Sequence, residues 1–157
     1  MKKMNNKGFS LVELIIVIAI MAILIVVLAP QYLKYVERSR NSTDMQNITE
    51  ITSAIQIYAA DPESPATLAA GTYDVEIKKT GGSCGNATVT QAITNAGLNL
   101  ADIKCSSKTA WDNYVIKVNV TSDGGVSFDY VSKVGTTEND NLKDKMAGKV
   151  QEAPSEP

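Results

Sequence analysis

Hydrophobic and polar residues are distributed unevenly along this chain of 157 residues. From Phe9 to Ala29 the only polar side chains are Ser10 and Glu13, and the apolar run stops at Pro30. A helix of this length, rising ~1.5 Å per residue, reaches roughly 30 Å, which is the thickness of a bilayer core. The pattern therefore predicts a membrane-spanning helix.

Beyond Pro30 the pattern becomes that of an amphipathic helix. Apolar residues recur at spacings of three and four, which places them on one face: Met45, Ile48, Ile51, Ile55 and Tyr58. Polar residues largely occupy the other face: Asp44, Gln46, Asn47, Glu50 and Gln56. A Pro at bilayer level usually kinks a helix without ending it, so one helix is expected from about Phe9 to about Ala60. Asp61 and Pro62 are expected to end it.

Alternation of apolar and polar residues predicts three strands after this helix. The first is Thr72–Lys79, which Gly81, Gly82 and Gly85 are expected to break. The other two, from Tyr114 to Thr121 and from Val126 to Ser132, form a hairpin around the turn Ser122–Gly125. They are expected to pack on the amphipathic half of the helix as a small core.

The segment between these strands is less clearly patterned. Val89–Ala96 predicts a short helix with Thr88 or Thr90 as its cap and Gly97 after it, and a strand is the alternative. The fold class is accordingly α+β, with a long N-terminal helix on a small antiparallel sheet. Residues 9–30 form the spanning half of the helix, 31–134 the globular domain, and 135–157 a polar, mobile tail with a weak helix near Leu142–Val150.

Glu13 is the anomaly of the apolar segment. An unpaired carboxylate in hydrocarbon costs at least a few kcal/mol, so it normally has a cationic partner or a function. No Lys or Arg follows Glu13 within a helical turn. Physical reasoning alone leaves two interpretations: Glu13 reaches the headgroups from the helix end without further role, or it pairs with a cation supplied from elsewhere.

The residues from Lys7 to Leu14, with sequence KGFSLVEL and followed by the apolar run, resemble the class III signal of type IV prepilins and related pilin-like proteins. The resemblance implies that a prepilin peptidase cuts between Gly8 and Phe9 on the cytoplasmic side and methylates Phe9. Residues 1–8 are then a leader peptide. It also implies that Glu13 pairs with the terminal amine of a neighbouring subunit, which would satisfy both buried charges.

Pro30, Tyr32 and Tyr35 also resemble the spacing found in type IVa pilins, and Pro30 is therefore an expected assembly residue. A secretory signal fits less well, because the apolar run is too long and the small residue precedes it. The resemblance implies a structural subunit of a helical homopolymer, anchored once in the cytoplasmic membrane and then exported in a filament for adhesion, motility or DNA uptake. Its expected partners are the prepilin peptidase and a pilus assembly platform.

Two alternatives remain within the same resemblance. One is a pseudopilin of a type II secretion or competence system. The other is a minor adhesive subunit whose exposed contact surface comprises Trp111, Tyr114 and the loop from Cys84 to Cys105. In the competing interpretation, which we favour, Trp111 packs in the core.

Composition offers little support for catalysis. Histidine is absent, two cysteines make no cluster with metal-ligand spacing, and no arrangement of nucleophile and base is recognisable. We expect no enzyme and no cofactor.

Removal of Met1–Gly8 takes away three Lys, so the net charge goes from −2 to 12 − 17 = −5. A mildly acidic product argues against a general nucleic-acid surface, and we expect no sequence-specific nucleic-acid partner. In an exported domain Cys84 and Cys105 are expected to form a disulfide.

Overall fold

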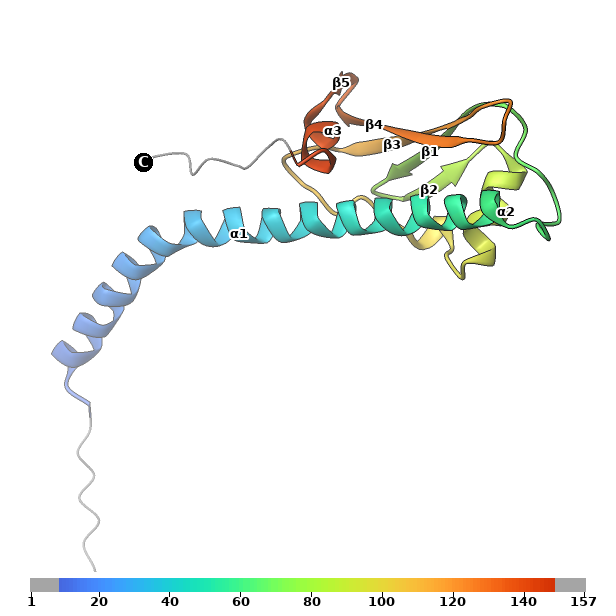
Figure 1. Cartoon of the computed structure of the whole chain (residues 1–157). Coiled ribbons are helices and arrows are strands. Elements are labelled where there is room, and N and C mark those ends of the chain that lie inside the picture. Colours follow the sequence, from blue (N-terminus) through green and yellow to red (C-terminus); the bar gives the residue numbers. More distant parts are fainter. Residues whose placement is uncertain (1–8, 149–157) are drawn as a thin grey trace, which may run out of the picture. The chain divides into compact units, whose positions relative to one another are not determined.

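The computed structural model describes residues 9–148, and the chain divides into two units, Met1–Arg38 and Ser39–Pro157 (Figure 1). The predicted leader, residues 1–8, lies outside the described residues, as does Gly8. Helix α1 (Leu11–Ala60) runs through Pro30 without ending. The expected single helix is confirmed, and Asp61 follows its last residue.

Five strands form one antiparallel sheet in the order β2-β1-β3-β4-β5. They are β1 (Gly71–Lys78), β2 (Gly81–Cys84), β3 (Asn113–Val120), β4 (Val126–Val134) and β5 (Thr137–Asn139). The predicted hairpin is present as β3 and β4, which pair from Asn113↔Lys133 to Val120↔Val126. A long helix with a small antiparallel sheet confirms the α+β, pilin-like fold class.

The strand β1 ends at Lys78, ahead of the three glycines that were expected to break it. Gly81 and Gly82 instead open β2, which pairs with the end of β1 through Lys78↔Gly81 and Ile77↔Gly82. The 3-10 helix η1 (Leu100–Asp102) lies so close that a Cβ on Gly81 would be 2.5 Å from the Ala101 carbonyl oxygen. The glycines are therefore required by the close approach of another backbone segment.

The short helix of the middle segment is confirmed as α2 (Ala87–Asn95). Its cap differs from the expected Thr88 or Thr90, because the side chain of Asn86 accepts from the Val89 amide at 2.9 Å. The Thr90 hydroxyl donates back to the Asn86 carbonyl at 2.9 Å. The chain leaves the helix through Gly97, whose φ of 82° favours glycine.

The region expected to be a mobile tail is folded as far as it is described. After β5, helix α3 (Asn141–Met146) places Leu142 at 0% exposure in the core. The Ser132 hydroxyl holds this segment by donating to the Asn139 carbonyl at 3.1 Å and accepting from the Leu142 amide at 3.2 Å. The prediction of a mobile tail is thus corrected for 135–148, whereas the helix expected near Leu142 is present as α3. Residues 149–157 lie outside the described residues.

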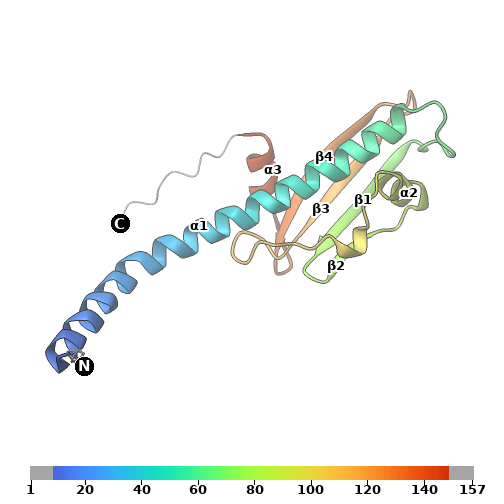
Figure 2. The same cartoon turned by 90° about the horizontal axis from the view of Figure 1, so that it is seen from below.

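The core of the C-terminal unit lies between the sheet and the helices on one of its faces. Figure 2 shows α1 and α2 covering the same side of the strands. The predicted stripe of α1 supplies four buried residues, Ile48, Ile51, Ile55 and Tyr58. They pack with alternate sheet residues and with α2, including Val75, Ile77, Tyr114, Ile116, Val118, Val89 and Ile93.

Candidate functional site

The apolar half of α1 has the length and composition needed to cross a membrane. The window that meets this criterion has a mean hydropathy of 3.4, and 0% of it is buried inside the protein. Its large side chains are all exposed, from Val17 at 45% to Leu11 at 74%. Such a surface needs either lipid or other apolar helices around it.

Glu13 and Ser10 close the first turn of α1 by reciprocal contacts. The Ser10 amide donates to Glu13 Oε2 at 2.9 Å, and the Ser10 hydroxyl accepts from the Val12 amide at 3.3 Å. These contacts follow the capping-box pattern, which satisfies amides that have no partner within the helix. The carboxylate also lies at the helix N-terminus, where the helix dipole favours negative charge.

Sequence reasoning missed this intramolecular partner of Glu13, although the S-x-x-E spacing of residues 10–13 could have revealed it. The contact leaves the carboxylate exposed and places it beside the peptide that follows Phe9. Phe9 itself is 91% exposed.

Farther along α1, the Arg38 guanidinium lies 5.9 Å from the centre of the Tyr35 ring, a cation–π arrangement.

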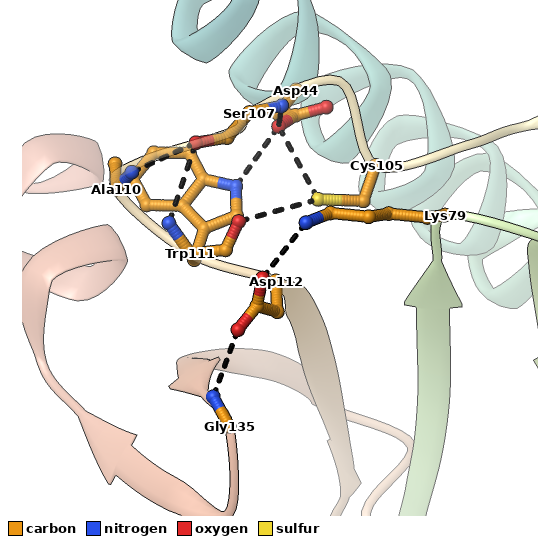
Figure 3. A network of polar contacts seen from close by, with 8 residues as sticks. All are labelled: Asp44, Lys79, Cys105, Ser107, Ala110, Trp111, Asp112 and Gly135. Atoms are coloured by element: carbon orange, nitrogen blue, oxygen red, sulfur yellow. Dashed lines mark hydrogen bonds and ion pairs between the residues drawn. The ribbon is translucent and has the colours of Figure 1, made fainter.

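A buried carboxylate organises the globular unit (Figure 3). Asp44, which the sequence pattern placed on the polar face of α1, is 0% exposed. It accepts from the amides of Ser106 at 2.7 Å and Ser107 at 3.0 Å, and from Trp111 Nε1 at 2.9 Å. The burial of Asp44 could have been predicted from the sequence, because position 44 lies four residues before Ile48 and so continues the buried stripe 48, 51, 55, 58.

The two cysteines are both free, so the expected disulfide is not formed. Cys84 pairs with Val75 in the β1–β2 ladder. The Cys105 amide instead donates a hydrogen bond to the carbonyl of Lys78, which lies three residues after Val75 in β1. Three residues of strand span ~10 Å, beyond the ~7 Å limit for the Cα atoms of a disulfide. The Cys105 thiol instead faces Asp44, at 3.8 Å from Oδ2.

Burial is the main cause that raises the pKa of the Cys105 thiol to about 12, and the negative charge of the nearby Asp44 carboxylate adds to the effect. The thiol is thus held in its unreactive form.

Near the Cys105 thiol, Lys79 forms an ion pair with Asp112 at 2.7 Å, and Asp112 also accepts a hydrogen bond from the Gly135 amide at 2.9 Å. The Lys79 ammonium and this amide lower the pKa of Asp112. Within residues 9–148 no group of His, Cys, Asp or Glu side chains is placed to hold a metal ion.

Trp111 and Tyr114 are 1% and 0% exposed. The favoured prediction, that Trp111 packs in the core, is confirmed, and the adhesive surface that relied on both aromatic residues is not available. The Lys145 ammonium of α3 lies 5.4 Å from the centre of the Trp111 ring. The segment between Cys84 and Cys105 holds α2 and η1.

Comparison with known proteins agrees with the N-terminal pattern. Residues 3–29 match the family model of the prokaryotic N-terminal methylation motif. The chain is 37% identical over 59 residues to the type IV major fimbrial protein FimA of Dichelobacter nodosus. That stretch is 38% of the chain and 38% of the relative. No solved structure matches. The resemblance to type IV pilins is therefore confirmed on the N-terminal segment, and the chain is pilin-like in sequence and in fold.

Proposed function

We propose that this chain is a structural subunit of a type IV pilus. The observation that carries the proposal is an exposed, capped apolar helix within the methylation motif, followed by a separately packed α+β unit. Lipid covers such a helix in a membrane, and other helices cover it in a filament. The match to the fimbrial relative covers 38% of that protein's length, so the function of the whole chain is a proposal.

Processing precedes assembly in this proposal. A prepilin peptidase cuts between Gly8 and Phe9 and methylates the new terminus at Phe9. The proposal is supported by residues 3–29, which match the motif named for this modification. Until assembly, the helix from Phe9 to Ala29 holds the subunit in the cytoplasmic membrane as a single span, with the globular unit exported.

Assembly exchanges lipid contacts for contacts between helices. Burial of each large apolar side chain contributes roughly 1.5 to 3 kcal/mol relative to water, so many such side chains hold a polymer that has left the membrane. Glu13 supplies the register by binding the Phe9 amine of a neighbouring subunit. The Glu13–Ser10 contact supports this role, because it keeps the carboxylate partnered in the free subunit and accessible to a neighbour.

Pro30 lies inside α1 and is the remaining expected assembly residue. A Pro leaves one carbonyl without its helical partner, so the helix can bend or unwind there when neighbouring helices pack against it. A pilus assembly platform is the proposed partner for extraction. Adhesion, motility and DNA uptake are the proposed uses of the filament.

The deciding experiment is the intact mass of the main subunit in filaments sheared from the native host. We expect a chain that begins at Phe9 with one added methyl group and both thiols still reduced. A chain that is cut and methylated but remains in the membrane points instead to a pseudopilin or minor subunit. A chain that is uncut from Met1 contradicts the proposal.

A further inference from the structure

Strand β4 is covered along only part of its outer side. The strand has nine residues, and β3 pairs with residues 126–133 on its inner side. On the outer side β5 pairs with residues 132–134. Within residues 9–148, no other strand pairs with residues 126–131 on the outer side. Such an uncovered edge is a template on which a strand of another molecule can pair.

The backbone groups that point outward along this edge belong to alternate residues. In an antiparallel strand, neighbouring residues direct their amide and carbonyl to opposite sides. The Gly125 carbonyl faces β3, because it accepts a hydrogen bond from the Thr121 amide at 2.9 Å. Val126, Phe128 and Tyr130 therefore direct their amides and carbonyls away from β3. A strand that arrives at this edge would bond these groups.

One of the outward amides already has a partner. The Tyr130 amide donates to Asp129 Oδ1 at 3.0 Å, and the Lys143 ammonium of α3 lies 3.0 Å from the same oxygen. The Leu142 amide donates to the Ser132 hydroxyl at 3.2 Å, which fixes α3 beside the end of β4 (Figure 1). The carboxylate is thus held from two sides. An arriving carbonyl would meet a negative charge at the place where it needs a donor.

We propose that Asp129, positioned by Lys143, is an edge guard that prevents the sheet of one molecule from pairing with the sheet of a second copy. With β5 over the end of β4 and the carboxylate over Tyr130, only residues 126–128 stay open, and about three residues is the lower limit of a strand. A second copy is the partner that the guard excludes, because it carries the same edge. The inference does not rest on the pilus function, since the guard acts on the folded globular unit itself.

Removal of the carboxylate tests the guard in the full chain in detergent. Asp129→Ala frees one outward amide on each of two edges, so we expect the association constant measured by sedimentation to rise about tenfold. Lys143→Ala keeps the carboxylate but removes the ammonium that positions it, so we expect a smaller rise. Glu76→Ala is the matched control, because it removes the acid of another surface ion pair, with Lys78 at 2.9 Å, from a residue that is paired on both sides. Asp129→Ala that sediments like the wild type and like Glu76→Ala overturns the inference.

A second substitution shows whether the association uses this edge. Val126→Pro removes one outward amide hydrogen and leaves the β3–β4 ladder intact, because Pro is tolerated on edge strands. We expect the double variant, Asp129→Ala with Val126→Pro, to return to the association constant of the wild type. Hydrogen exchange of residues 126–131 should slow in Asp129→Ala as its concentration rises.

Urea unfolding, followed by the fluorescence of Trp111, separates edge pairing from aggregation of unfolded chains. We expect Asp129→Ala to unfold near the urea concentration of the wild type, because the side chains of Asp129 and Lys143 are 44% and 52% exposed. Association of Asp129→Ala that persists in the double variant, or that begins only where the chain unfolds, overturns the inference.

Discussion

The Asp44 carboxylate accepts a hydrogen bond of 2.9 Å from the indole Nε1 of Trp111, and both side chains are at most 1% exposed. The bond joins α1 to the segment that leads into β3. The same carboxylate binds two further amides, so it fixes the backbone of the segment as well as one ring. A buried charge with several donors is well satisfied, whereas each donor without it is costly.

Asp44→Ala should destabilise the globular unit strongly. The variant leaves the buried Trp111 Nε1 and two amides without their acceptor, so we expect the free energy of unfolding to fall by about 3 to 5 kcal/mol. Trp111 is the only tryptophan, so its fluorescence during urea unfolding of the full chain in detergent reports the change. Glu50→Ala, at an exposed position of the same helix, should change stability by less than about 0.5 kcal/mol. Equal effects of the two variants would contradict the role of Asp44.

Sequence periodicity predicted the elements whose residues alternate or repeat on one face. The long helix and the β3–β4 hairpin follow from local patterns, because each element buries one side of its own residues. The apolar segment and Glu13 were likewise visible, since a polar group in such a run stands out. Phe9 and Gly8 came from resemblance to a family and from no physical pattern.

Apart from the local Ser10–Glu13 contact, the features that sequence reasoning missed depend on distant parts of the chain. Asp44 is buried because donors more than 60 residues away surround it. Gly82 belongs to a strand because β1 offers an edge and η1 passes close by. The disulfide fails because Cys84 and Cys105 meet different positions of β1. Spacing along the chain could indicate that position 44 lies on the buried face of α1, but it does not identify these distant partners.

Gly81→Ala should weaken the contact between β2 and η1. A Cβ there would lie 2.5 Å from the Ala101 carbonyl oxygen, and the φ of 141° disfavours a side chain. We expect a loss of about 2 kcal/mol in the free energy of unfolding. Gly85→Ala is the matched control, because nothing lies within 4 Å of its Cβ position. If both variants unfold at the same urea concentration, the close approach of η1 has no energetic weight.

Alkaline pH should destabilise the unit through Cys105. The folded state raises the pKa of this thiol from 9.0 to about 12, so between these values the folded chain binds more protons than the unfolded chain. The stabilisation is complete below pH 9 and is lost as pH rises towards 12. Burial also raises the pKa of Tyr114, which acts in the same direction. Urea unfolding at several pH values should show a smaller loss in Cys105→Ala than in Cys84→Ala, and identical slopes would contradict the assignment.

Glu13→Ala should separate insertion from assembly. The variant keeps the apolar segment, so we expect membrane insertion and processing to be normal, while sheared filaments fall at least tenfold because the Phe9 amine of a neighbour lacks its partner. Ser10→Ala is the decisive comparison, because it removes the hydroxyl of the cap but leaves the carboxylate. If loss of the helix cap explained the defect, Ser10→Ala would reproduce much of it, at ~1 kcal/mol for a cap. Near-normal filaments from Ser10→Ala and few from Glu13→Ala would assign the effect to pairing between subunits, and normal filaments from Glu13→Ala would remove the role of Glu13 altogether.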